Sequence, residues 1–227
     1  MATTDDFLPG ILPDVPGCPL PTVRFHVHRA VMEFCRESGI WHEDLPPIDL
    51  VNDQRDYILP VTPGVMFRQV ERVSPRVGDS YPPRLIHKTE QQLDKERPGW
   101  RMWFANLPLY YSTDVKASKV SVTATPRGMT QPTSITVHVS MLPTEDAQTI
   151  PDFIAEQWRE AIETGAKARI LGMPSQHPWS SKQDALELRQ AFLVKCDEAT
   201  IVAIRESAGE GQQSTDGRAF GDYIFNL

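Results

Sequence analysis

Cysteine is scarce in this chain, and the few cysteines present do not suggest a disulfide framework. The 227 residues include three cysteines, at positions 18, 35 and 196, and no pair is spaced as Cys-x-x-Cys. We therefore expect free thiols, as is usual in a reducing cytoplasm. Long apolar runs are lacking too, since no stretch approaches the roughly 20 residues of a membrane span. The acidic start, Met1 to Asp6, lacks the basic region of a signal peptide, so we expect a soluble protein made in the cytosol.

An excess of basic residues is also missing. Lys and Arg number 23 against 30 Asp and Glu, which gives a formal net charge of −7. Proteins that wrap nucleic acid usually present a basic surface, and this balance predicts none. An acidic wall would repel a duplex and let it slide, so the charge is compatible with DNA passing nearby without specific binding.

Motifs for catalysis or cofactor binding are absent. The phosphate-loop pattern GxxxxGK[ST], the dinucleotide pattern GxGxxG and the hydrolase elbow GxSxG do not occur. His26 and His28 are two apart on a predicted helix, so they point in different directions. The other histidines lie in separate predicted elements, without cysteine or carboxylate at ligand spacing: His42, His87, His138 and His177. We therefore expect no metal, no cofactor and no enzymatic activity.

One acidic stretch loosely resembles a calcium loop. Asp49, Asp53 and Asp56 are closely spaced, but the following glycine and the distal glutamate of such a loop are missing. The stretch predicts a solvated turn.

Proline is abundant and unevenly placed. The 20 prolines crowd into the first 21 residues and into residues 46–151. Five of them fall within residues 7–21, a density that excludes a helix interior or a central strand. We expect residues 1–21 to form an extended segment that lies along the surface.

Three segments have the periodicity of amphipathic helices. They cover about 22–38, 151–171 and 181–207, with Thr22 as N-cap of the first and Gly39 as its stop. The small residues Ala161, Gly165 and Ala166 in the second would let another helix approach closely. We expect residues 22–45 and 147–208 to form one helical domain.

Residues 46–146 change to short strands separated by turns. Residues 48–51 and 57–61 predict a β-hairpin, and residues 119–125 and 134–140 alternate in the manner of half-buried strands. The expected fold class is α+β: a three-helix bundle with an inserted antiparallel β-sheet or sandwich and an extended C-terminal arm.

The arm, residues 209–227, combines flexible and adhesive composition. A polar, glycine-rich stretch precedes a group of apolar residues that need a surface to cover them: Phe220, Tyr223, Ile224, Phe225 and Leu227. Fully extended, the arm would reach roughly 60 Å. We interpret it as a segment that docks on a partner.

Two tryptophans lie close together after a Pro-Gly turn. Trp100 and Trp103 flank Arg101, with Arg97 nearby. Three interpretations stay open: a corner of the core, a contact with another subunit or with a tail protein, and stacking on single-stranded nucleic acid.

Several phrases resemble the head-to-tail adaptor proteins of tailed bacteriophages. They include Phe-Leu-Pro-Gly-Ile-Leu-Pro-Asp-Val-Pro-Gly-Cys-Pro at 7–19 and Glu-Phe-Cys-Arg-Glu-Ser-Gly-Ile-Trp at 33–41. The remaining matching segments, which together cover nearly the whole chain, are residues 45–57, 142–154, 158–162, 173–174 and 178–179. The resemblance rests on the order of these segments and not on a catalytic signature.

The resemblance implies a structural role in the virion. Such adaptors form a ring, usually of twelve copies, beneath the portal, and genomic DNA passes through its channel. Their helical part surrounds the channel, their β part faces the tail or nozzle protein, and their C-terminal segment reaches the portal. The alternatives are a tail-side completion or terminator protein that uses the β region as its main contact, and a nucleic-acid-binding factor.

Overall fold

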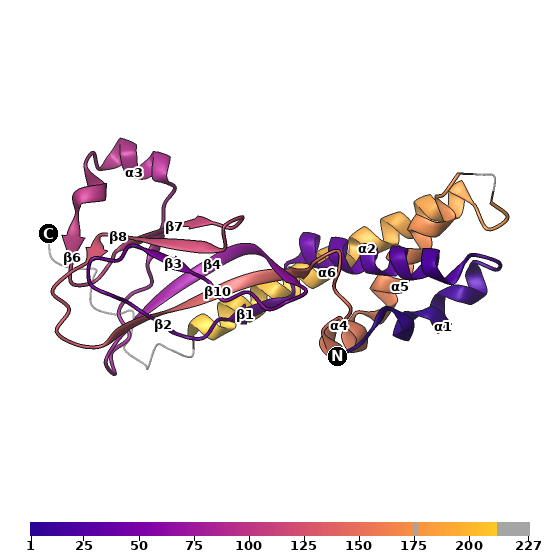
Figure 1. Cartoon of the computed structure of the whole chain (residues 1–227). Coiled ribbons are helices and arrows are strands. Elements are labelled where there is room, and N and C mark those ends of the chain that lie inside the picture. The colour runs from indigo at the N-terminus through magenta and orange to yellow at the C-terminus, as the bar shows by residue number, and fades with distance from the viewer. Residues whose placement is uncertain (175–176, 213–227) are drawn as a thin grey trace, which may run out of the picture.

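The computed structural model describes residues 1–174 and 177–212, with side chains described through residue 206, and its fold is mixed α+β (Figure 1). Most of the helices gather at one end of an elongated molecule and the strands at the other, where one short helix also lies, and one long helix runs from the helical end to the sheet (Figure 1). Within the described residues, no helix combines the length and apolar character needed to cross a bilayer.

The first 21 residues correct the expectation of an extended segment. They form short helical turns: η1 (Thr4–Phe7), α1 (Leu8–Ile11) and η2 (Leu12–Asp14). Pro9 and Pro13 stand in the first turns of α1 and η2, where a missing N–H costs nothing. Phe7, Ile11 and Val15 are buried in the core, so this segment is part of the helical packing.

The first long helix, α2 (Leu20–Ser38), begins two residues before the predicted start, with Pro21 in its first turn. The prediction of Thr22 as N-cap is wrong, because Pro19 holds that position and Thr22 lies inside the helix. It ends as expected at Gly39, whose φ of 65° lies in the left-handed region and whose N–H donates to the Cys35 carbonyl. The second predicted helix is divided at Trp158 into α4 (Asp152–Gln157) and α5 (Arg159–Leu171). Trp158 interrupts it with φ −119° and ψ 17°, outside the helical region.

The third long helix, α6 (Lys182–Gln212), extends past its predicted end at 207. Ser181 caps its start, accepting a hydrogen bond from the Asp184 N–H at 3.4 Å. Residues 209–212, which the sequence assigned to the arm, are therefore helical. Once a helix has formed, each added residue gains a hydrogen bond at little further cost.

The helices α2, α5 and α6 pack against one another pairwise. Close approach of α5 and α6 depends on Gly165: a Cβ built there would lie 2.6 Å from ring atoms of Phe192, which is fully buried. The expectation that small residues on α5 admit a neighbouring helix is confirmed. Phe34 on α2 completes the contact, with its ring centroid 6.4 Å from that of Phe192.

Glu33 ties the three helices together. Its carboxylate, on α2, accepts hydrogen bonds from Arg169 on α5 and from Arg189 on α6, while only 13% of the Glu33 side chain is exposed. Burial works to raise the pKa of Glu33, but the two guanidinium groups outweigh it and hold the pKa below its usual range.

Replacing Glu33 with glutamine is expected to lower the free energy of unfolding by about 2 kcal/mol at neutral pH, because two guanidinium groups lose their shared anion. The folded-state pKa is depressed, so the contribution is present above the unfolded pKa of about 4.3 and is lost as pH falls through the folded value. Urea unfolding of both proteins from pH 7 to pH 3 measures this. A difference between them that persists undiminished at pH 3 would contradict it.

Three sheets make up the β region. In the first, β10 (Thr133–Pro143) pairs antiparallel with β1 (His42–Asp44), β2 (Ile48–Asp49) and β4 (Val65–Val77). The second has the order β3 (Asp56–Ile58), β8 (Lys119–Thr123), β7 (Tyr110–Asp114) and β5 (Ile86–His87), and the third joins β6 (Phe104–Ala105) to β9 (Thr125–Pro126).

Two strand expectations are corrected. Residues 48–61 do not form a hairpin, because β2 pairs with β10 while β3 pairs with β8. Nor are all pairs antiparallel, since β5–β7 and β6–β9 are parallel. The predicted strands at 119–125 and 134–140 are present and lie in different sheets.

Candidate interaction surfaces

A helical excursion rises from the β region at the end farthest from the helices (Figure 1). It consists of α3 (Glu90–Glu96) and η3 (Trp100–Met102), and we call it the tip. Thr89 begins it with a capping box: its hydroxyl accepts from the Gln92 N–H at 3.2 Å, and Gln92 Oε1 accepts from the Thr89 N–H at 2.9 Å.

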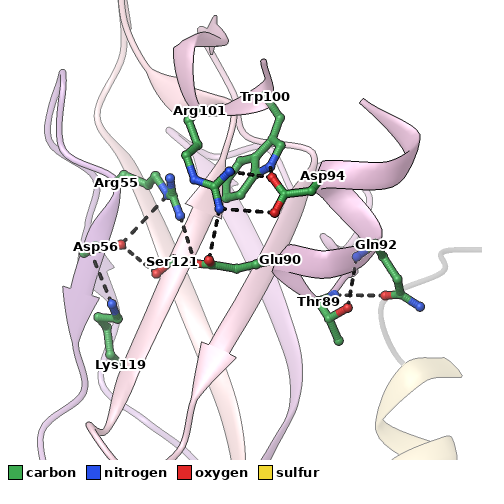
Figure 2. Close-up of polar contacts among 10 residues, drawn as sticks. All are labelled: Arg55, Asp56, Thr89, Glu90, Gln92, Asp94, Trp100, Arg101, Lys119 and Ser121. Carbon is green, nitrogen blue, oxygen red and sulfur yellow. Dashed lines mark hydrogen bonds and ion pairs between the residues drawn. The ribbon is translucent and has the colours of Figure 1, made fainter. Parts of the chain in front are cut away.

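Trp100 is the buried centre of the tip (Figure 2). The side chain is 3% exposed and its Nε1–H donates to Asp94 Oδ1 at 2.8 Å. The guanidinium carbons of Arg55 and Arg101 lie 4.2 Å and 4.5 Å from the Trp100 ring centroid. Trp100 is therefore buried within the tip, outside the main core cluster.

Charged groups fasten the tip to the strands beneath it (Figure 2). Arg101 pairs with Asp94 and with Glu90, and Arg55 pairs with Glu90 at 3.3 Å. The hydrogen bond from Arg101 holds the pKa of Asp94 below its usual range. These charges are mutually compensated, so the network positions α3 and offers no reactive group.

Asp56 anchors the same network on β3. Ser121 Oγ donates to its carboxylate at 2.6 Å, and Lys119 lies 3.5 Å away. Burial works to raise the pKa of Asp56, but Ser121 and Lys119 outweigh it and lower the pKa. Asp53 pairs with Arg127 at 2.5 Å, so two of the three carboxylates of the supposed calcium loop have cationic partners.

The outer surface of the tip is apolar and basic. Trp103 is half-buried, with the Arg97 guanidinium carbon 4.9 Å from its ring centroid, while Met102 is 77% exposed. A hollow of about 380 Å³ opens beside them, lined by Arg97, Pro98, Gly99, Trp100, Met102 and Trp103. Tryptophan, methionine and arginine are enriched in protein interfaces. Of the two predicted contact tryptophans, Trp103 is the accessible one.

A second surface lies on α6. Its buried side is the predicted stripe, with Phe192, Cys196 and Ala199 at most 2% exposed. Sequence reasoning missed a second apolar side, exposed to solvent and formed by Leu186, Leu193, Val194, Ile201 and Ile204. Spacings of seven, eight and three residues put four of them on one face. We call this set the α6 face.

Hollows mark both ends of the α6 face. One of about 510 Å³ lies between α5 and α6, where small residues leave space, and is lined by Ala168, Arg169, Gly172, Lys182, Ala185, Leu186 and Arg189. The other, of about 540 Å³, is lined by Ile204 and by residues of β4, β5 and β7: Gln69, Val70, Glu71, His87, Tyr111 and Thr113.

Cysteines and histidines do not form a reactive centre in the described residues. All three cysteines are buried, and burial raises the pKa of Cys35 and of Cys196 to about 12, which keeps both as thiols. No three His, Cys, Asp or Glu side chains of the described residues are grouped to hold a metal ion. His42 and His138 nevertheless adjoin, because β1 pairs with β10.

The apolar residues of the predicted docking arm lie outside the described residues, namely Phe220, Tyr223, Ile224, Phe225 and Leu227. Comparison of the chain with known protein families and with curated proteins finds no match. The function is therefore inferred from the surfaces described above.

Proposed function

We propose that this protein is a structural virion component, a head-to-tail adaptor that forms a ring between the portal and the tail of a bacteriophage. The observation that carries the proposal is the α6 face, an exposed apolar flank of α6. That helix runs along an elongated subunit from the helical end to the sheet (Figure 1). A flank of this kind fits a neighbouring copy in a closed ring. In this proposal α2, α5 and α6 serve as the three-helix bundle and the sheets as the sandwich.

The charge of the chain supports a channel for DNA. Each copy carries −7, and a ring multiplies that charge by its copy number, twelve in the proposal. A strongly acidic ring repels a duplex and lets it slide through without specific binding. Two of the four residues that would favour nucleic-acid binding are engaged internally: Trp100 is buried and Arg101 is paired with Asp94.

We assign the portal contact to the segment that follows α6, because its apolar residues need a partner surface. Deleting the last ten residues, 218–227, is expected to abolish binding to portal rings and to leave the domain folded. Co-sedimentation with purified portal measures the binding, and circular dichroism checks the fold. The matched control replaces polar residues of the same segment, Gln213, Ser214 and Thr215, with alanine and is expected to bind normally. Normal assembly of the deletion on portals would refute the assignment.

The tip supplies the tail contact in this proposal. Met102 and Trp103 line its hollow. The helix α3 of the tip stands at the end opposite α2 and α5 (Figure 1). The same observation favours the second candidate, a tail-side completion or terminator protein whose main contact is the β region. Cross-linking to portal or to tail-tube protein separates the two. Both candidates cross-link to tail protein from a label at residue 102, but only an adaptor also cross-links to portal through the arm, whereas a terminator binds no portal.

A further inference from the structure

A buried histidine lies between two carboxylates where the sheet meets α6. His138, on β10, is 2% exposed, and its Nδ1 lies 2.8 Å from Asp44 Oδ1 on β1. Its Nε2 lies 3.4 Å from Glu71 Oε2 on β4 and has no hydrogen-bond partner among the described residues. Both ring nitrogens therefore face a carboxylate oxygen.

A second histidine connects this site to α6. The ring of His42, on β1, has its centroid 5.2 Å from that of His138. His42 Nε2 lies 3.7 Å from Glu206 Oε2, near the end of α6, and the His42 side chain is 11% exposed. The Nδ1 of His42 is buried and lacks a hydrogen-bond partner among the described residues.

The remaining charges around the pair come from β4. Arg72 lies 3.7 Å from Asp44, and Arg68 is engaged with the Arg36 carbonyl at 2.7 Å. Tyr111 on β7 donates a hydrogen bond to the Glu71 carbonyl, and burial raises the pKa of Tyr111, so it stays neutral near pH 7.

The protonation state of the pair decides how well these contacts are satisfied. A neutral imidazole has one N–H donor and one lone pair, so a neutral His138 must turn its lone pair toward Asp44 or toward Glu71. A protonated ring donates to both. Three carboxylates, those of Asp44, Glu71 and Glu206, face the two histidines, while the Arg72 guanidinium contacts Asp44. Protonation of both histidines adds two positive charges beside these carboxylates.

We propose that His42 and His138 form a proton-controlled latch that holds the last turns of α6 against the sheet. With both rings protonated, His42 attracts Glu206 and the latch is closed. With both rings neutral, three carboxylates crowd the site and the end of α6 separates more readily from β1 and β4. Histidine is the side chain whose charge responds most readily to pH in the physiological range. The latch rests on these contacts alone and does not depend on the adaptor role.

Hydrogen exchange of the full-length protein tests the latch. Amide protection of residues 199–206, corrected for the intrinsic pH dependence of exchange, is expected to fall about tenfold or more from pH 5.5 to pH 8. A single linked proton can change such an equilibrium by up to about tenfold per pH unit. Protection in α2 reports on the global fold and is expected to stay constant. Equal protection of residues 199–206 at both pH values would overturn the proposal.

Two variants and a control test whether the latch causes the pH dependence of amide protection in α6. Glu206→Gln changes a side chain that is 56% exposed, so the fold tolerates it, and it is expected to reduce protection at pH 5.5 to the pH 8 level in α6 alone. His42→Gln, which removes the imidazole that faces Glu206, is expected to remove the pH dependence. His177→Gln removes a histidine that stacks on Trp179 near the start of α6 and is expected to retain it. An unchanged pH dependence in both latch variants would also overturn the proposal.

Discussion

Replacing Gly165 with valine is expected to lower the free energy of unfolding by about 3 kcal/mol, because overpacking a close helix contact forces the backbones apart. The added Cβ alone would lie 2.6 Å from Cδ2 and Cε2 of Phe192. That ring is fully buried and packs beside Phe34, so it has no space to retreat. The midpoint of thermal unfolding should fall by about 10 °C.

Two further variants make the measurement specific. Thr164→Val introduces the same side chain at a half-buried neighbouring position and is expected to change stability by less than about 0.5 kcal/mol. Combining Gly165→Val with Phe192→Ala removes the clashing ring, so the double variant should lose less stability than the sum of the two single losses. Full additivity, or a loss below 1 kcal/mol for Gly165→Val, would show that α5 and α6 are not in this contact.

The largest functional effect is expected from charges on the α6 face. The double variant Ile201→Asp, Ile204→Asp should weaken self-association into rings by about a thousandfold, taking each anchor as worth about 2 kcal/mol. The two isoleucines are 50% and 63% exposed, so aspartate at these positions leaves the core of the subunit intact. Sedimentation equilibrium, with and without portal, gives the association constant.

The matched control is Ile58→Asp on β3, where an isoleucine is 79% exposed on a different surface. It adds one negative charge, where the double variant adds two, and is expected to assemble as the unaltered protein does. If Ile58→Asp disrupted rings equally, net charge and not the α6 face would govern assembly. If the double variant assembled normally, the neighbouring copy would bind elsewhere.

Local signals in the sequence predicted the helices well. Gly39 ended α2 as predicted because this effect depends on residues within one turn. The small side chain at 165 pointed to a close helix contact for the same reason. The prediction of an extended N-terminal segment was wrong because proline is excluded from a helix interior but is favourable in a first turn. The helices α1 and η2 are so short that they consist of little more than a first turn.

Features that depend on distant pairings could not be predicted. The hairpin at 48–61 looked favourable locally, yet β2 and β3 found partners far along the chain, at β10 and β8. The histidine pair has the same origin, because the register of β1 on β10 places His42 opposite Ser140 and Asp44 opposite His138. The α6 face escaped notice because periodicity identified one apolar stripe, and exposure of the second is a property of the packed molecule.

The unbroken length of α6 has a mechanical consequence. Its 31 residues contain no proline and span about 46 Å at 1.5 Å per residue, from the helical end of the molecule to the sheet. A rod of this kind acts as a lever. If α6 tilts where it packs on α5, its last turns beside His42 move with it. A displacement of those last turns likewise moves the end of α6 that packs on α5.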